Sequence, residues 1–363
     1  MQGSTLRTVR SAVIALLATV AVTATPAQTG GDRPAAQAVT RALPYVERPR
    51  ISSLKVSPSN KHAAFLWRGN EGRLVLAVVD LAEPSNVRVV AGNPQLDISN
   101  IHWVNDRRLV FDVRPPEITI FEGEAGTFGV DIDGQRMQLL VNWTRQITSE
   151  TGTRFIPRVL PYGWGFFRAL AGRGDEALFH QMENPEQGQW GVVALARLDT
   201  ATGQLRRVSD GKPASTVRHV TDPDSNLRIV VTENGGRARV HHRPGDSREW
   251  EVVEDLPLLE ANRMEPLYAE ADGSWVVSSR RGRDADALFV YDPRTRKLDP
   301  EPLVAAEGFD MGTDLEVDTA RRTVVGVHIE TARPQTVWLD DRLVQLQRTI
   351  DAALPPGRMN RLL

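Results

Sequence analysis

The chain contains no cysteine, which excludes disulfides, zinc–thiolate centres, iron–sulfur clusters and a cysteine nucleophile. Lysine is scarce, with four residues among 44 basic ones, and 46 acidic residues bring the net charge to -2. No broad cationic surface follows from this balance, so we expect no nucleic-acid partner. No apolar run in the chain reaches the length of about 20 residues that a membrane-spanning helix needs. What remains is 363 residues of ordinary globular composition, 41% hydrophobic and 25% charged.

The amino-terminal segment, residues 1–27, has the pattern of a secretory signal peptide. Arg7 and Arg10 precede the apolar run 12–24, and small residues follow it. The alternative is an uncleaved interfacial or membrane-anchoring helix. Residues 28–42 are small, polar and proline-bearing, which predicts a flexible leader. We therefore expect a periplasmic or secreted protein with no stable membrane anchor after cleavage, and a folded domain over residues 43–363.

From residue 51 onward the sequence predicts strands and turns, because short apolar runs are separated by Asp, Asn, Gly and Pro. A polar turn followed by a strand rich in branched residues recurs six times. One residue from each turn marks the repeat: Asn60, Asp106, Asp175, Asp224, Asp272 and Asp318. The steps between them are 46, 69, 49, 48 and 46 residues, and the long step implies an insertion.

A second module, strand–turn–strand with an Asp-led turn, lies downstream in several repeats, as in residues 128–141, 194–208 and 288–298. A four-stranded unit every 40–50 residues is typical of a β-propeller blade. A β-sandwich also has many strands but would not keep such a period. We therefore predict an all-β fold, a β-propeller of six to seven four-stranded blades that is incomplete.

The last segment changes to helical periodicity. Residues 340–354 place Leu343, Leu346, Ile350 and Leu354 on one face, and Pro355 follows. This predicts a short surface helix before a chain that stops ahead of its final blade. An unfinished ring would expose a blade edge, so self-association through that edge is expected.

Three groups of residues resemble the propeller of bacterial prolyl oligopeptidase-like serine peptidases, the acylaminoacyl-peptidase and dipeptidyl-peptidase relatives. They are residues 43–65 (with Leu54-Lys55-Val56-Ser57-Pro58), residues 103–111 (with Trp103-Val104-Asn105-Asp106), and residues 323–358 (with Trp338-Leu339-Asp340). The likeness spans residues 43–363 and rests on the order and spacing of the groups. It implies a propeller that covers an active site and restricts access to short peptides.

The chain departs from that family in its chemistry. Family members carry a carboxy-terminal α/β-hydrolase domain with a Ser-Asp-His triad, and no G-x-S-x-G nucleophile elbow occurs here. Gly245-Asp246-Ser247 comes nearest, but Glu249 replaces the second glycine, and Ser274 after Gly273 fits a strand. No catalytic residue can therefore be transferred, and this chain alone is expected to be inactive.

Other chemistry-bearing groups have simpler interpretations. His241 and His242 are neighbours on a strand and should point to opposite faces, so they are poorly placed to share a metal. Residues 131–134 (Asp-Ile-Asp-Gly) resemble part of a calcium loop but fit a hairpin turn better. The acids of Glu122-Gly123-Glu124 and the cluster Arg280-Arg281-Gly282-Arg283-Asp284 are expected in solvated loops. The remaining histidines are scattered over the repeats: His62, His102, His180, His219 and His328.

The sequence thus predicts no catalytic, cofactor-binding or metal-binding residue. The leading hypothesis is the non-catalytic, substrate-gating propeller portion of an exported prolyl oligopeptidase-like serine peptidase, which would meet short peptides if joined to a hydrolase domain. The alternative is an independent periplasmic β-propeller that acts as a binding scaffold. A propeller glycosidase would need paired inward carboxylates, which the sequence does not locate.

Overall fold

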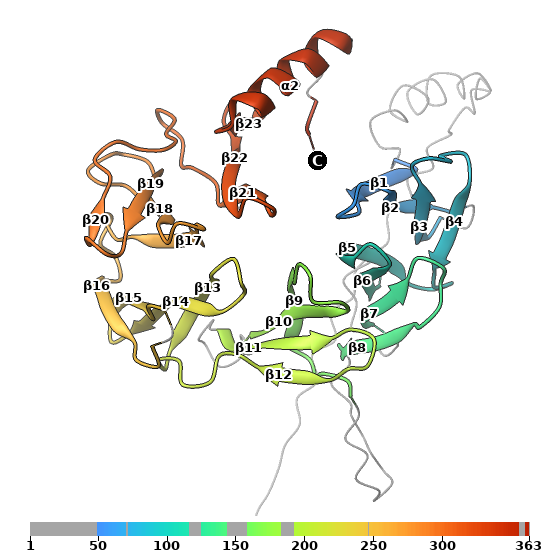
Figure 1. The fold of residues 1–363 in the computed structure, drawn as a ribbon, viewed down its shortest axis with the longest axis horizontal. Coiled ribbons are helices and arrows are strands. Elements are labelled where there is room, and N and C mark those ends of the chain that lie inside the picture. The colour runs from blue at the N-terminus through green and yellow to red at the C-terminus, as the bar shows by residue number, and fades with distance from the viewer. Residues whose placement is uncertain are drawn as a thin grey trace, which may run out of the picture. The chain divides into compact units, whose positions relative to one another are not determined.

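The computed structural model describes residues 49–69, 72–115, 125–143, 158–182, 192–245, 247–355 and 360–362. All of them belong to one compact unit, Pro49–Leu363. This unit is an all-β six-bladed propeller of mostly four-stranded blades with one short C-terminal helix, which confirms the predicted fold class (Figure 1). The predicted signal peptide and leader lie outside the described residues.

Each blade is an antiparallel sheet of consecutive strands. Blade 1 comprises β1 (Ile51–Val56), β2 (His62–Arg68), β3 (Leu74–Asp80) and β4 (Val87–Ala91), and blade 2 comprises β5 (Asp97–Asn105), β6 (Arg108–Arg114), β7 (Gly126–Asp131) and β8 (Gln138–Asn142). Blade 3 comprises β9 (Trp164–Ala169), β10 (Glu176–Met182), β11 (Val192–Asp199) and β12 (Leu205–Arg207), and blade 4 comprises β13 (Thr216–Thr221), β14 (Leu227–Asn234), β15 (Arg237–His242) and β16 (Glu251–Pro257). Blade 5 comprises β17 (Glu265–Ala269), β18 (Trp275–Ser279), β19 (Ala287–Asp292) and β20 (Lys297–Leu298), and blade 6 comprises β21 (Asp314–Asp318), β22 (Thr323–Glu330) and β23 (Pro334–Trp338).

Apolar cores lie between consecutive blades, because alternate residues of a strand point to opposite faces of its sheet. On β10, Ala177 and Phe179 join the core shared with blade 2, while Leu178 between them joins the core shared with blade 4. Five such cores link blades 1 to 6 in sequence. Among the described residues no sixth core joins blade 6 to blade 1.

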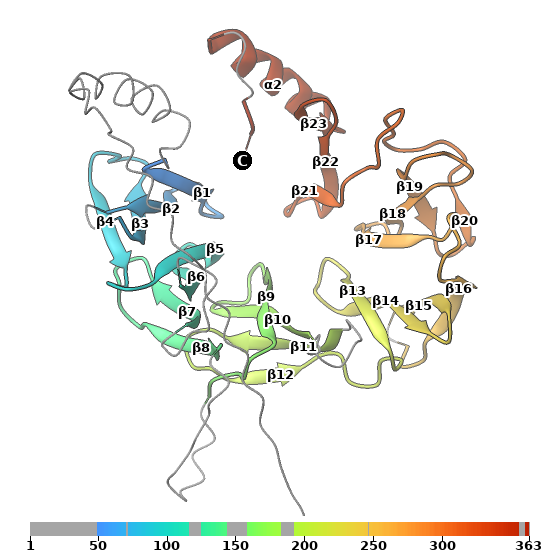
Figure 2. The same cartoon turned by 180° about the vertical axis from the view of Figure 1, so that it is seen from behind.

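The first strand of each blade lies innermost, around a common centre (Figures 1 and 2). In five blades this strand carries an extra residue relative to its neighbour, which makes a β-bulge. The bulges lie between Ser52 and Lys55, between Ser99 and His102, at Phe167, at Val217 and at Leu267. In blade 6 the extra residue is on the second strand, at Val325. Since a bulge increases local twist, this repeat lets each inner strand bend where the blades converge.

Gly126, the first residue of β7, has no room for a side chain. A methyl group there would overlap the carbonyl oxygen of Val141 and lie 2.9 Å from a methyl of Leu139. We expect Gly126→Ala to destabilise the protein by about 1–3 kcal/mol, the usual cost of overpacking. Urea unfolding would measure this, with Gly69→Ala as the control because its nearest atom is 3.8 Å away. Equal midpoints for the two variants would contradict the packing described for β7.

The C-terminal helix, α2 (Asp341–Ala353), begins at the N-cap Asp340, whose side chain accepts a hydrogen bond from the backbone N–H of Arg342. None of its residues is buried, and Leu346 is 46% exposed. The prediction of a short surface helix is therefore confirmed. Over the part of the chain that the structure describes, no helix is long and apolar enough to cross a membrane.

Candidate functional site: the innermost strands

The innermost strands of the blades converge around the centre of the propeller (Figure 1), and several of them carry polar groups. In blade 2, Asn100 occupies the β5 bulge with a φ of 48°, a conformation that asparagine tolerates better than most residues. Its amide donates to Asp112 at 2.9 Å, and the hydroxyl of Thr127 donates to the same carboxylate at 2.7 Å. Burial raises the pKa of Asp112 above its usual range, although both hydrogen bonds act in the opposite direction.

The inner strands of blades 3 to 5 contribute aromatic and charged groups. Phe166 of β9 stacks on His102 of β5 with ring centroids 4.3 Å apart, so two blades share this contact. Arg218 of β13 forms an ion pair with Glu265 of β17, which links blades 4 and 5. These two contacts therefore link neighbouring blades through their inner strands.

In blade 6, hydrogen bonds join a carboxylate, an imidazole and a hydroxyl in series, the one such series among the described residues. Glu316 of β21 binds Nε2 of His328 on β22, and Nδ1 of His328 lies 2.7 Å from the hydroxyl of Thr336 on β23. His328 and Thr336 are direct cross-strand partners. Because the three side chains come from consecutive strands of one sheet, we interpret this hydrogen-bonded series as a brace across blade 6.

The brace makes a simple prediction. Thr336→Val should lower the free energy of unfolding by about 1 kcal/mol, because it removes one hydrogen bond. Thr336→Ser keeps the hydroxyl and serves as the matched control. Chemical denaturation of both variants measures the difference, and a serine variant as weak as the valine variant would count against the hydrogen bond.

The histidine pair of β15 has separate partners on separate faces. His241 lies 3.0 Å from the hydroxyl of Thr232, whereas His242 packs edge-on against Trp275 of blade 5, 4.9 Å between ring centroids. The interpretation as an ordinary strand pair fits these contacts. Among the described residues no group of three or more His, Asp or Glu side chains is arranged to hold a metal ion.

The other sequence candidates lie where turns were expected. Residues 131–134 form the β7–β8 hairpin turn, in which Gly134 has a φ of 84° and Asp133 accepts the N–H of Gln135. Arg280 lies in an exposed turn and pairs with Asp286 and Asp310. Glu122 and Glu124 fall outside the described residues.

The two serines nearest to a nucleophile motif have local partners. The hydroxyl of Ser247 accepts the N–H of Glu249, and that of Ser274 donates to Asp272. Neither contact involves an imidazole.

Sequence reasoning missed two features of this region. The bulges depend on strand register, which a single sequence does not reveal. His219 of β13 is 7% exposed and neither of its ring nitrogens has a hydrogen-bond partner. Burial, followed by the charges of Lys212 and His180, lowers its pKa to about 3. Only the apolar context of β13 could have indicated that this histidine is buried.

No protein-family model and no curated protein matches this sequence. Among solved structures, TolB from Acinetobacter baumannii matches at 13% identity and TM-score 0.34, over 73% of this chain and 56% of that one. A structure from a study of two prolyl endopeptidases matches at 13% identity and TM-score 0.45, over 80% and 43% of the respective chains. Pyrococcus horikoshii acylaminoacyl peptidase matches at 12% identity and TM-score 0.43, over 83% and 47%. The chain thus spans between two fifths and three fifths of the length of these proteins, and the likeness concerns the propeller fold alone.

Proposed function

We propose that this chain is the non-catalytic, substrate-gating propeller portion of an exported prolyl oligopeptidase-like serine peptidase. The observation that carries the proposal is the position in the blades of the residues that resemble the peptidase family. Residues 54–65 lie on the first hairpin of blade 1, residues 103–111 on the first hairpin of blade 2, and residues 323–354 on β22, β23 and α2. The first two groups thus occupy equivalent places in blades 1 and 2, as the repeat requires, and the third lies in blade 6 and in the helix that follows it.

The inner strands supply a reason for the gating role. On this proposal, a peptide moving along the centre would meet the Arg218–Glu265 pair and the ring of Phe167, which is 36% exposed. These groups recognise charged ends and apolar side chains without attacking a carbonyl carbon. On this proposal the nucleophile is supplied by another domain, and the propeller selects short peptides by access.

The activity of the purified chain tests the first half of this proposal. Incubated with short chromogenic peptides, it is expected to give no turnover above buffer. Turnover that a serine-directed inhibitor abolishes would contradict the assignment of a non-catalytic role. A matched incubation after heat denaturation controls for spontaneous hydrolysis.

Self-association is the second proposal that follows from the fold. β4 is the outer strand of blade 1, and its Val87 and Val89 are 40% and 49% exposed. An exposed apolar edge strand offers unpaired backbone groups to another chain. Sedimentation velocity should show concentration-dependent association that Val89→Lys weakens. A compact monomer at every concentration would remove this proposal and leave the gating role untouched.

A further inference from the structure

Blade 3 carries a row of arginines on the face that it turns toward blade 4. Arg168, Leu178, Arg197 and Arg206 are successive cross-strand partners on β9, β10, β11 and β12. Directly opposed residues of an antiparallel sheet point to the same face. Leu178 belongs to the core shared with blade 4, so the three arginines point toward blade 4 as well.

The first arginine of the row is hydrogen-bonded to blade 4. Arg168 donates to the hydroxyls of Thr221 and Ser225 and to the carbonyl oxygen of Asp222. Its Nη2 therefore ties the two blades together.

Arg197 differs sharply from Arg168. It is 8% exposed, and its buried Nε has no hydrogen-bond partner. Burial lowers its pKa, the nearby charge of Arg173 lowers it further, as does that of Arg206, and the carboxylates of Glu176 and Asp222 act in the opposite direction. Across the described ranges, no carboxylate lies within ion-pair distance of Arg173, Arg197 or Arg206. A buried guanidinium without an ion-pair partner is costly unless an anion pairs with it.

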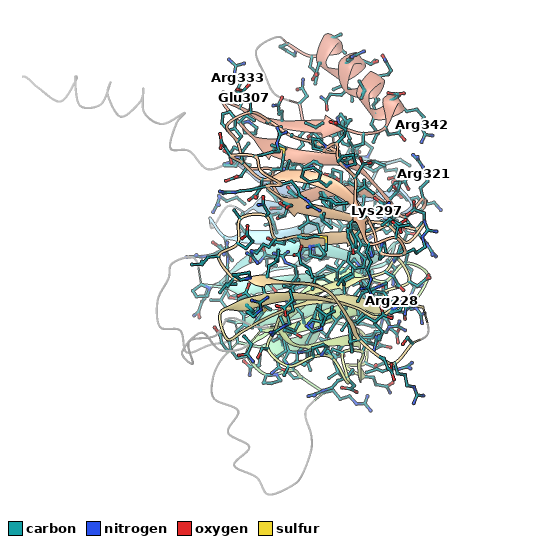
Figure 3. The ribbon with its side chains drawn as sticks, turned by 90° about the vertical axis from the view of Figure 1, so that its left-hand side faces the viewer. Arg228, Lys297, Glu307, Arg321, Arg333 and Arg342 are labelled. Atoms are coloured by element: carbon teal, nitrogen blue, oxygen red, sulfur yellow. The ribbon has the colours of Figure 1, made fainter. Side chains whose placement is uncertain are left out.

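The neighbouring acid on blade 4 is already engaged. The carboxylate of Asp222 accepts Nε of Arg228 at 2.7 Å and the backbone N–H of Asn226 at 2.8 Å. Arg243 adds a further positive charge, with its guanidinium 4.8 Å from the ring centroid of Trp250. Blade 4 thus contributes two further arginines near Asp222, Arg228 and Arg243, and Figure 3 shows where Arg228 lies.

We propose that Arg173, Arg197 and Arg206 bind a small oxyanion of the phosphate type. The guanidinium group presents a fixed fork of donors that matches phosphate oxygens. Arg197 supplies a rigid, buried donor, and the exposed Arg173 and Arg206 approach from the β9–β10 turn and from β12. The site is independent of the proposed gating role, since it lies away from the inner strand of blade 3.

Isothermal titration of the full chain with inorganic phosphate tests the site, against sodium chloride of equal ionic strength. We expect saturable binding to the unmodified protein and at least about tenfold weaker binding to Arg206→Gln, because one charge-assisted hydrogen bond is lost. Arg206 is exposed, so this variant leaves the fold intact. Arg333→Gln is the matched control, since Arg333 is exposed at the opposite end of the blades (Figure 3).

A second variant separates ligand binding from a structural role. Arg197→Met removes a buried charge that forms no ion pair among the described residues, so without phosphate its melting temperature should equal or exceed that of the unmodified chain. With phosphate, only the unmodified chain should gain stability. The proposal is overturned if phosphate does not bind saturably, if Arg333→Gln weakens binding as much as Arg206→Gln, or if Arg197→Met unfolds more readily in the absence of phosphate.

Discussion

Replacing Arg108 with methionine is expected to lower the free energy of unfolding by about 3–5 kcal/mol, the usual cost of breaking a buried ion pair by removing one partner. The Arg108 side chain is fully buried, and it donates to Asp131 at 2.8 Å and to the hydroxyl of Thr200 at 2.8 Å. Thr200 follows β11, so this guanidinium joins blade 2 to blade 3. With methionine at this position, the carboxylate of Asp131 and the carbonyl oxygen of Thr200 would each lose the hydrogen-bond donor that Arg108 supplies. Asp131 is only 7% exposed.

The neighbouring residue provides the control. Arg107 is exposed and its side chain has no described ion-pair partner, so Arg107→Gln should change stability by less than about 0.5 kcal/mol. Urea midpoints of the two variants give the comparison directly. If the free energies of unfolding of Arg108→Met and Arg107→Gln differ by less than about 1 kcal/mol, the buried network does not hold the two blades together.

Acid should destabilise the protein well before its carboxylates titrate. Burial lowers the pKa of His219 to about 3 and that of His102 to about 4, from 6.5 for an exposed histidine. Since both pKa values are depressed in the folded state, the unfolded chain binds more protons below pH 6.5. Stability is therefore complete above pH 6.5 and falls as the pH drops toward 4, by about 1.4 kcal/mol per pH unit for each histidine.

Unfolding free energies at pH 7.5 and pH 5 should consequently differ by about 3 kcal/mol, with His102 contributing less because it is partly exposed. His219→Leu isolates the larger effect. At pH 7.5 it should be about as stable as the unmodified protein, because the imidazole makes no hydrogen bond. At pH 5 it should be the more stable of the two. Equal stability of the unmodified chain at both pH values would refute this account of the buried histidines.

Much of the fold could be predicted because its signal is repeated. The turns at Asn60, Asp106, Asp175, Asp224, Asp272 and Asp318 each precede the second strand of a blade, as the period requires. Alternation then placed neighbours such as His241 and His242 on opposite faces. The helix was predicted over 340–354 and occupies Asp341–Ala353, because a capping aspartate and a following proline mark its ends.

The arginine cluster was not predictable, because it depends on register. Arg168, Arg197 and Arg206 are far apart along the chain, and only cross-strand pairing aligns them with Leu178. The same limit applies to Arg108, whose partner Thr200 is 92 residues away. A single sequence shows which residues alternate, but it does not show which alternating strands oppose each other.

The most direct test of the proposed function is the protein sequence encoded downstream of the codon for Leu363, read in all frames. The proposal predicts a G-x-S-x-G elbow within a few hundred codons, followed by the aspartate and histidine of an α/β-hydrolase. A stop codon followed by an unrelated gene would contradict it and would favour a propeller that binds its ligands independently.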